Sequence, residues 1–273
     1  MISVVIPVSG RPDKIGRAIK SVLMQSGVDL EILVIENNSE DPDKVRQAVE
    51  DVGSDKIKFY SLKECRNANV ARNFGFLKST GDYISYLDSD DEYLENHLSS
   101  SVRLMEEHSA DFVYGSMTVF NGEKFSTARA RPILEGQSGA GYLFSNPKGI
   151  APTPTYLVRR SVLESVRWDE NLARHQDLDF FISITNGYKA ICKEESTVLV
   201  HWVKGEKRSY CFESMVKFYI KWRGLLGVRG RAVYSYDKVK VAVINRDLYG
   251  AAFFGLRFCY NFSLASLKRL FGI

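Results

Sequence analysis

Cysteine is scarce in this chain, and its cysteines stand far apart. The four are Cys65, Cys192, Cys211 and Cys259. None forms a Cys-x-x-Cys pair, which excludes the common zinc-binding and dithiol redox motifs, and there is no dense framework for disulfides. We therefore expect a protein of a reducing compartment, the cytoplasm.

Long uncharged runs and a strong charge of one sign are also missing. No window reaches the roughly 18 apolar residues that a membrane-spanning helix needs. The apolar run at 2–8 lacks a preceding basic region and is too short for a signal peptide, so it predicts a first strand. The net charge of +4 suits an anionic ligand or an acidic membrane surface, but it is too small to indicate a nucleic-acid partner.

What the chain does contain is a regular alternation of strand and helix patterns. Apolar runs at 2–8, 31–35, 57–62 and 83–87 predict buried strands, and residues at helical spacing lie between them. Strands separated by helices indicate right-handed crossovers and a parallel sheet. With 45% hydrophobic residues among 273, the chain can bury a sizeable core. The ends of the first, second and fourth strands should meet at one crevice.

Three aspartates follow the fourth predicted strand, where the chain must turn. Asp88, Asp90 and Asp91 would lie at the carboxyl edge of the sheet, where open α/β sheets bind ligands. Acids this close repel one another, so a site that gathers them usually holds a cation. Mg²⁺ or Mn²⁺, held by one or two carboxylates, completes its shell with substrate phosphates. The pattern therefore indicates a metal-bound diphosphate.

Two other interpretations apply to acids in this position. Asp90 and Asp91 could cap a helix that begins near Glu92 and complement its dipole. A calcium loop of the EF-hand type is disfavoured, because its sixth position would be Tyr93 in place of Gly and its twelfth Ser99 in place of Glu.

The second half of the chain is less regular. Residues 117–126 predict a hairpin around Asn121-Gly122. Residues 129–154 are rich in Gly, Pro and Ser, which is typical of a mobile loop or lid. A helix is predicted from about 178 to Gly187, and a last strand at 197–203.

Four motifs occur in a fixed order along the first part of the chain. They are Ile6-Pro7-Val8, Ile35-Glu36-Asn37-Asn38-Ser39, Ala71-Arg72-Asn73-Phe74-Gly75 and Leu87-Asp88-Ser89-Asp90-Asp91. With these motifs, over roughly residues 1 to 210, the sequence resembles glycosyltransferase family 2, inverting enzymes of the GT-A fold. The resemblance implies an α/β protein whose mostly parallel, Rossmann-like central sheet is flanked by helices.

The chain is expected to divide into a part that carries the resemblance and a part that lies beyond it. A catalytic domain would span 1–215, with a nucleotide-binding half at 1–110 and an acceptor-binding half at 111–215. Residues 216–273 would form a helical C-terminal extension. The activity expected is transfer of a hexose from a nucleotide diphosphate sugar, favoured as UDP-linked, to a glycan or lipid-linked acceptor in surface polysaccharide assembly. Homo-oligomerisation is left open.

By resemblance, particular residues receive roles. Asp88 and Asp90 would hold the ribose and the diphosphate with Mn²⁺ or Mg²⁺, and Asp177 would be the catalytic base. The usual two aspartates of the base-contacting segment are here Glu36-Asn37, and the Asn37 amide oxygen can still accept from the N3–H of uracil or thymine. The other residues expected at the nucleotide sugar are Pro7, Val8, Ser9, Arg11, Asn69, Arg72, Asn73 and Ser89.

A further departure concerns the segment that closes the site. The family often has a Tyr-Arg-x-His type sequence there, and aligning Ser209 on its terminal serine puts His201 at the tyrosine and Lys204 at the histidine. Either His201 is a metal ligand, or Lys204 replaces one unit of metal charge by contacting the diphosphate. We favour the second.

Plain structural interpretations stand beside these roles. Asp177 could N-cap its helix. The acidic residue that usually stands beside it in the family is replaced here by Gln176. Arg72 could be a solvated helix residue in place of a diphosphate or base contact. His175 could touch the acceptor, although an exposed histidine is the simpler interpretation.

The last fifty or so residues are aromatic and basic. They fit a helix lying in the plane of the inner leaflet, with Lys268 and Arg269 at the headgroups, or equally a helix packed on the protein or a partner subunit.

Two rival functions would use the same crevice. A nucleotidyltransferase would want a glycine-rich loop in place of Ser9-Gly10-Arg11-Pro12, and a non-catalytic nucleotide-sugar-binding relic would have no need to retain Asp88, Asp90 and Asp177 together.

Overall fold

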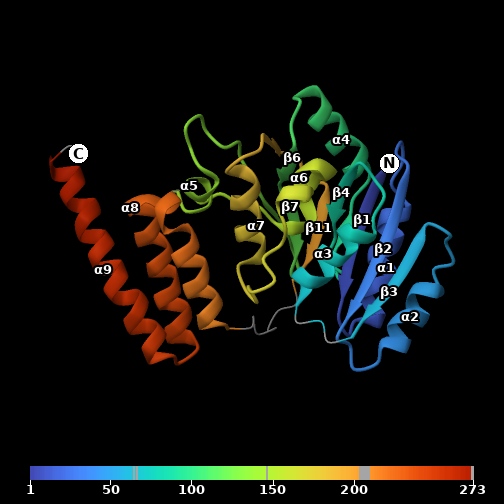
Figure 1. Cartoon of the computed structure of the whole chain (residues 1–273), viewed down its shortest axis with the longest axis horizontal. Coiled ribbons are helices and arrows are strands. Elements are labelled where there is room, and N and C mark those ends of the chain that lie inside the picture. Colours follow the sequence, from blue (N-terminus) through green and yellow to red (C-terminus); the bar gives the residue numbers. More distant parts are fainter. Residues whose placement is uncertain (64, 66, 146, 203–209, 272–273) are drawn as a thin grey trace.

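The structure is a computed structural model that describes residues 1–63, 65, 67–145, 147–202 and 210–271, with 264–271 described by their backbone alone. Within these residues, seven strands form a central sheet in the order β10-β6-β9-β4-β1-β2-β3 (Figure 1). The strands are β1 (Ile2–Val8), β2 (Leu30–Asn37), β3 (Ile57–Leu62), β4 (Tyr83–Tyr86), β6 (Phe112–Gly115), β9 (Leu157–Arg159) and β10 (Ala190–Lys193).

The middle of this sheet confirms the predicted parallel arrangement. β1 pairs in parallel with β2 on one side and with β4 on the other. Every residue of β1 and β2 is buried, because helices cover both faces, and this explains their nearly unbroken apolar runs. The carboxyl ends of β4, β1 and β2 therefore lie side by side. β9 is inserted antiparallel between β4 and β6.

Helices connect the strands and cover the sheet. They are α1 (Pro12–Leu23), α2 (Pro42–Glu50), α3 (Ala68–Lys78), α4 (His97–Glu107), α6 (Arg160–Ser165) and α7 (Gln176–Thr185). Asn67 caps α3 by accepting from the backbone N–H groups of Asn69 and Val70. Gly75 lets α3 approach the sheet closely, since a Cβ there would lie 2.4 Å from a methyl group of Val5.

A second, four-stranded sheet has the order β5-β11-β7-β8. Its strands are β5 (Glu92–Tyr93), β11 (Val198–His201), β7 (Met117–Phe120) and β8 (Phe125–Ala128). The predicted hairpin is present as β7 and β8. The helix near Glu92 that the capping interpretation requires is absent, because the chain there first pairs with β11 and α4 begins only at His97 after the left-handed Asn96. The capping interpretation of Asp90 and Asp91 is therefore wrong.

The segment predicted as a mobile loop contains α5 (Gly139–Leu143) and a short 3₁₀ helix, η1 (Thr153–Thr155). Its middle is packed into the core. The ring of Tyr142 is fully buried, its hydroxyl donates to the carbonyl of Ile150 at 2.8 Å, and the guanidinium of Arg131 lies 4.7 Å from its centroid. These contacts fasten the connection between β8 and β9 to the rest of the protein.

The C-terminal extension consists of α8 (Phe212–Ile244), which is kinked at Gly227 (φ 60°), and α9 (Leu248–Phe271). In Figure 1 both lie at the end of the molecule opposite β3 and α2. Phe254 of α9 is fully buried, with its ring 6.0 Å from those of Phe212 and Tyr234. The Tyr234 ring in turn lies 5.4 Å from that of Phe144, which follows α5, so the inner face of the extension is packed on the rest of the protein. The predicted boundary at 215/216 falls inside α8. None of the helices in the described ranges is both long and apolar enough to span a membrane.

Candidate active site

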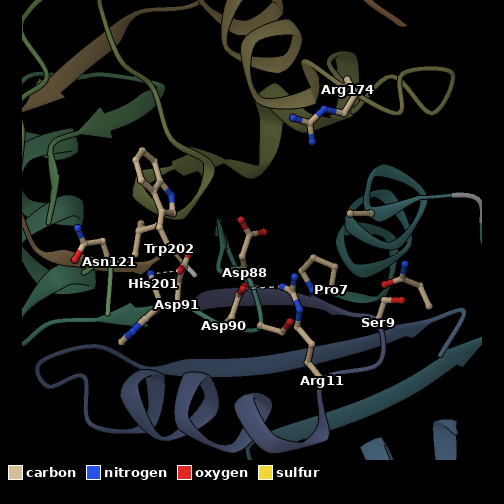
Figure 2. Close-up of a pocket in the computed structure, with 14 residues that line it drawn as sticks. Pro7, Ser9, Arg11, Asp88, Asp90, Asp91, Asn121, Arg174, His201 and Trp202 are labelled. Carbon is tan, nitrogen blue, oxygen red and sulfur yellow. Dashed lines mark hydrogen bonds and ion pairs between the residues drawn. The ribbon is translucent and has the colours of Figure 1, made fainter. Parts of the chain in front are cut away.

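A cavity of about 840 Å³ opens at the carboxyl ends of β1, β2 and β4. Figure 2 shows its lining residues. Sequence-predicted residues that line it are Pro7, Ser9, Arg11, Asn37, Asp88, Ser89, Asp90 and His201. The arrangement follows from the parallel sheet, because chain segments far apart in sequence leave neighbouring strands at the same edge.

Each of the three aspartates has a defined partner. Asp88 Oδ1 accepts from Arg72 Nη2 at 2.8 Å, and Asp90 Oδ2 lies 2.7 Å from Arg11 Nη1. Asp91 accepts from the backbone N–H of His201 at 2.9 Å (Figure 2). Positive charge at this edge of the sheet is therefore supplied in part by arginines.

The acidic edge still favours added positive charge. Burial raises the pKa of Asp90, and the Arg11 guanidinium works in the opposite direction. Burial and the neighbouring charge of Asp88 raise the pKa of Asp91 well above its ordinary value. Both shifts show that negative charge accumulates here at a cost, which a bound cation would reduce.

The donor atoms fit a hard divalent cation. Asp88 and Asp90 present only carboxylate oxygen, the ligand type of Mg²⁺ and Mn²⁺ sites that are completed by substrate phosphates. Among the residues described, no group of three or more His, Cys, Asp or Glu side chains could hold a metal by itself. His201 Nε2 lies 2.7 Å from Glu92 Oε1, so its imidazole is already engaged, and Lys204 lies outside the described residues.

The base-contacting motif divides into a side chain that faces the cavity and one that does not. Asn37 lines the cavity. Glu36 is buried and accepts from the backbone N–H of Ser39 at 2.8 Å and from the hydroxyl of Ser61. Glu36 therefore holds the turn after β2 in shape. Val8 is buried within β1.

Helix α3 connects this cavity to the segment that precedes α7. Asn69 donates to the carbonyl of Asp169 at 2.7 Å, and Asn73 donates to the carbonyl of Trp168 at 2.9 Å. Neither Asn69 nor Asn73 lines this cavity or the second cavity that adjoins it. Arg72 is only 5% exposed, so the interpretation of a solvated residue is wrong. Its guanidinium stacks 4.5 Å from the Trp168 ring centroid, and Nη1 lies 3.5 Å from Gln176 Oε1.

A second cavity, of about 1330 Å³, adjoins the first and shares with it Asp88, Asp91, Arg174, Val200 and Trp202. Asp177 lines this cavity, and burial raises the pKa of its carboxyl, although Arg72 opposes the shift. The carboxyl is therefore a stronger base than an exposed aspartate.

Two plain interpretations fail at the start of α7. The N-cap position is occupied by His175, with φ 63°, and Asp177 lies within the first turn, so Asp177 does not N-cap the helix. The His175 ring is packed 5.1 Å from Phe218 and 5.7 Å from Tyr234, so His175 is not an exposed histidine.

Sequence reasoning missed several lining residues. Trp202 directly follows β11 and could have been found by the strand-end argument that located the aspartates. Arg174 lies across the first cavity from Asp88 (Figure 2), and Lys238 lies on α8. No motif marks either cation, because only packing of α7 and α8 brings them to the cavities.

Comparison with known proteins agrees with this geometry. The sequence profile described as Glycosyl transferase family 2 matches residues 3–167. The chain belongs to glycosyl transferase family 2. The amylovoran biosynthesis glycosyltransferase AmsB of Erwinia amylovora is 28% identical over 250 residues, which are 88% of this chain and 82% of AmsB. The chain spans about a third of the uncharacterized Rickettsia glycosyltransferases that it matches.

Two further similarities bear on this family 2 chain. The Escherichia coli protein WfgD, a UDP-Glc:alpha-D-GlcNAc-diphosphoundecaprenol beta-1,3-glucosyltransferase, is 29% identical over 121 residues, 44% of this chain and 47% of WfgD. The crystal structure of S. aureus TarS 1-349 in complex with UDP-GlcNAc superposes with a TM-score of 0.66 at 18% identity, over 86% of this chain and 70% of the TarS 1-349 chain. The predicted GT-A fold is thereby confirmed.

Proposed function

We propose that this protein is an inverting glycosyltransferase that moves a hexose from a UDP-sugar to a hydroxyl group of a glycan or lipid-linked acceptor in surface polysaccharide assembly. The observation that carries the proposal is the position of Asp88 at the junction of two adjoining cavities. One contains the nucleotide motifs, and the other contains Asp177. Membership of family 2 and the activities for which AmsB and WfgD are named support it.

The first cavity is the donor site in this proposal. Asn37 would accept from the N3–H of uracil, and Arg11 and Arg72 would offset charge on the diphosphate. A divalent cation, when held by Asp90 and Asp88, would neutralise negative charge on the departing diphosphate. His201 and Lys204 remain the two alternatives for completing that site.

The second cavity is the acceptor site. An acceptor hydroxyl oxygen would attack the anomeric carbon on the face opposite the nucleotide, forming one carbon–oxygen bond while the bond to the β-phosphate oxygen breaks. The bonding electrons leave with the nucleoside diphosphate. The hydroxyl proton passes to the carboxylate of Asp177, whose burial makes it a better proton acceptor than an exposed aspartate.

The C-terminal helices carry a separate proposal, that the protein works in the cytoplasm at the inner face of the membrane. Large apolar side chains remain exposed on them, namely Ile220, Leu225, Tyr236, Val243, Ile244, Leu248, Tyr249, Leu256, Tyr260 and Phe262. Arg223, Arg231 and Arg257 line a groove of about 640 Å³ among them. Arginines within an apolar surface suit an anionic lipid interface.

The experiment that tests the transferase proposal is incubation with a panel of nucleotide sugars and Mn²⁺, with and without glycan and lipid-linked acceptors. Release of the nucleoside diphosphate with a glycosylated product is the expected result. Formation of a nucleoside triphosphate and a sugar 1-phosphate when inorganic diphosphate is added would identify a nucleotidyltransferase, and tight nucleotide-sugar binding without turnover would identify a non-catalytic binding protein. Asp177→Asn serves as the matched control, because it keeps size while removing the base.

A further inference from the structure

One wall of the acceptor cavity is made by the C-terminal extension. Met215, Lys238 and Val241 of α8 line it, as does Arg246, which follows that helix. The extension therefore contributes to the same cavity as Asp177, and residues far beyond the family motifs can select what binds there.

Lys238 is a cation without a counter-ion among the residues that the structure describes. Its ammonium nitrogen lies 5.0 Å from the ring centroid of Tyr234, and no carboxylate of the described part of the chain lies within 4 Å of it. The neighbouring Asp237 pairs with Lys148 instead. Burial lowers the pKa of Lys238 to about 8, with the positive charges of Lys148 and Arg174 acting in the same direction and Asp237 and Asp177 opposing them. Lys238 is thus still mostly charged at neutral pH.

Two arginines of the same cavity also lack a counter-ion among the described residues. In the described ranges, neither Arg174 nor Arg246 forms an ion pair with a carboxylate, and both line the cavity. Two of the cavity's acids are already engaged, since Asp88 pairs with Arg72 and Asp91 accepts from His201 N–H. Like charges gathered without carboxylate partners repel one another, so a site that keeps several cations together is suited to a bound anion.

A buried polar atom in the same cavity also indicates a bound ligand. Nδ1 of His175 has no hydrogen-bond partner in the described part of the protein, although it is shielded from solvent. His175 lines the same cavity as Lys238 and stands two positions before Asp177. An unsatisfied ring nitrogen beside unpaired cations marks a place where a ligand can supply the missing polar contact.

We propose that Lys238, Arg174 and Arg246 bind a phosphate or diphosphate group of the acceptor, and that Met215, Val241 and Ile244 contact the hydrocarbon chain next to it. The proposal rests on the proposed function and assigns its acceptor to phosphate-bearing saccharides. The same phosphate chemistry occurs in lipid-linked saccharides and in free sugar phosphates. The apolar side chains on the same wall favour the lipid-linked source.

The experiment is a calorimetric titration of the full-length protein, first saturated with UDP and Mn²⁺ so that the donor site is filled. The probes are hexyl phosphate, inorganic phosphate and hexyl glucoside. Hexyl phosphate should bind, inorganic phosphate should bind more weakly, and hexyl glucoside should bind weakest. Equal binding of hexyl and inorganic phosphate would overturn the lipid-linked assignment in favour of a free sugar phosphate.

Three variants make the test specific. Lys238→Met keeps the length that packs on Tyr234 and should weaken hexyl phosphate binding at least about ten-fold, the scale of one lost charge-assisted contact. Lys240→Met is the matched control, since Lys240 is exposed on the same helix and outside the cavity, and it should bind like the parent protein. Arg246→Gln changes an exposed residue that cannot disturb the core, and it should also weaken binding.

The contrary outcomes are distinct. Equal affinity in Lys238→Met and Lys240→Met, or displacement of hexyl phosphate by UDP, would overturn the proposed phosphate site. Failure of UDP itself to bind would count against the proposed function, while titration of the nucleotide-free protein would still test the three cations. If Lys238 acted only through Asp177, Lys238→Met would shift the pH profile of turnover and leave hexyl phosphate binding unchanged.

Discussion

Arg72 Nη2 donates to Asp88 Oδ1 at 2.8 Å, which ties a buried helix residue to the first aspartate of the acidic motif. The Arg72 side chain is 6% exposed and that of Asp88 is 37% exposed. Because Asp88 borders both cavities and Arg72 also reaches Gln176, this pair connects the donor side to the helix that carries Asp177.

A double-mutant cycle should show a coupling energy between Arg72 and Asp88. Arg72→Met leaves Asp88 without its partner, so it should destabilise the protein more in the parent background than beside Asp88→Asn. We expect a coupling of about 1 kcal/mol in the free energy of unfolding, modest because Asp88 is partly solvated. Urea denaturation of the parent, both single variants and the double variant measures it. Strictly additive effects would show that the pair contributes nothing.

Asp177→Asn should lower kcat about 10²-fold or more while leaving donor affinity nearly unchanged. The amide keeps the shape of the carboxyl group but cannot take the acceptor proton. Turnover and UDP binding are measured on the same preparation. Retained turnover, or a joint loss of stability and donor binding, would remove Asp177 as the base and direct the search to Asp169, Glu170 and Asp179.

The pH profile should carry the signature of the same carboxyl. The base works only when deprotonated, and burial raises the pKa of Asp177, so kcat/KM should fall as pH decreases through a value above the ordinary aspartate pKa of about 4. Activity is expected to be present above that value and lost below it. The residual activity of Asp177→Asn should lack this acid limb, and an unchanged limb in that variant would assign it to another group.

Asp90→Ala should weaken UDP binding about ten-fold or more in Mn²⁺ and abolish its dependence on the metal. The reason is that neither the carboxylate oxygens nor the diphosphate oxygens alone complete the coordination shell of the ion. Calorimetry with and without chelator measures both quantities. The variant also removes the carboxylate that lies 2.7 Å from Arg11 Nη1 and competes with the diphosphate for it, so binding without metal should improve. Parental affinity with parental metal dependence would refute the assignment of Asp90.

Exposed apolar residues of α9 should mediate vesicle binding. Leu256→Glu and Tyr260→Glu place carboxylates at positions that are 73% and 67% exposed, so they should reduce co-sedimentation with vesicles containing phosphatidylglycerol without unfolding the protein. Leu77→Glu is the matched control, since Leu77 is 68% exposed on α3, far along the chain. If all three variants bound like the parent, the extension would serve packing alone.

Much of the fold followed from local patterns. The apolar runs at 2–8, 31–35 and 57–62 predicted strands of the sheet, because a strand buried on both faces must be apolar along its length. The helix near Glu92 that the capping alternative required is absent, since pairing of Glu92–Tyr93 with β11 outweighs local helix preference. The insertion of β9 between β4 and β6 was not predicted, because strand neighbours are chosen by long-range packing.

The sequence by itself determined the order of motifs, the α/β class and the delivery of Asp88, Asp90 and Asp91 to one edge of the sheet, since these depend on periodicity and on where a strand ends. Only the tertiary structure decided which charges are paired. Arg72 and Asp88 meet across 16 residues of chain, and Lys238 reaches the cavity of Asp177 from a helix outside the family motifs. Such contacts depend on how helices pack, and packing of distant segments leaves no periodic trace in the sequence.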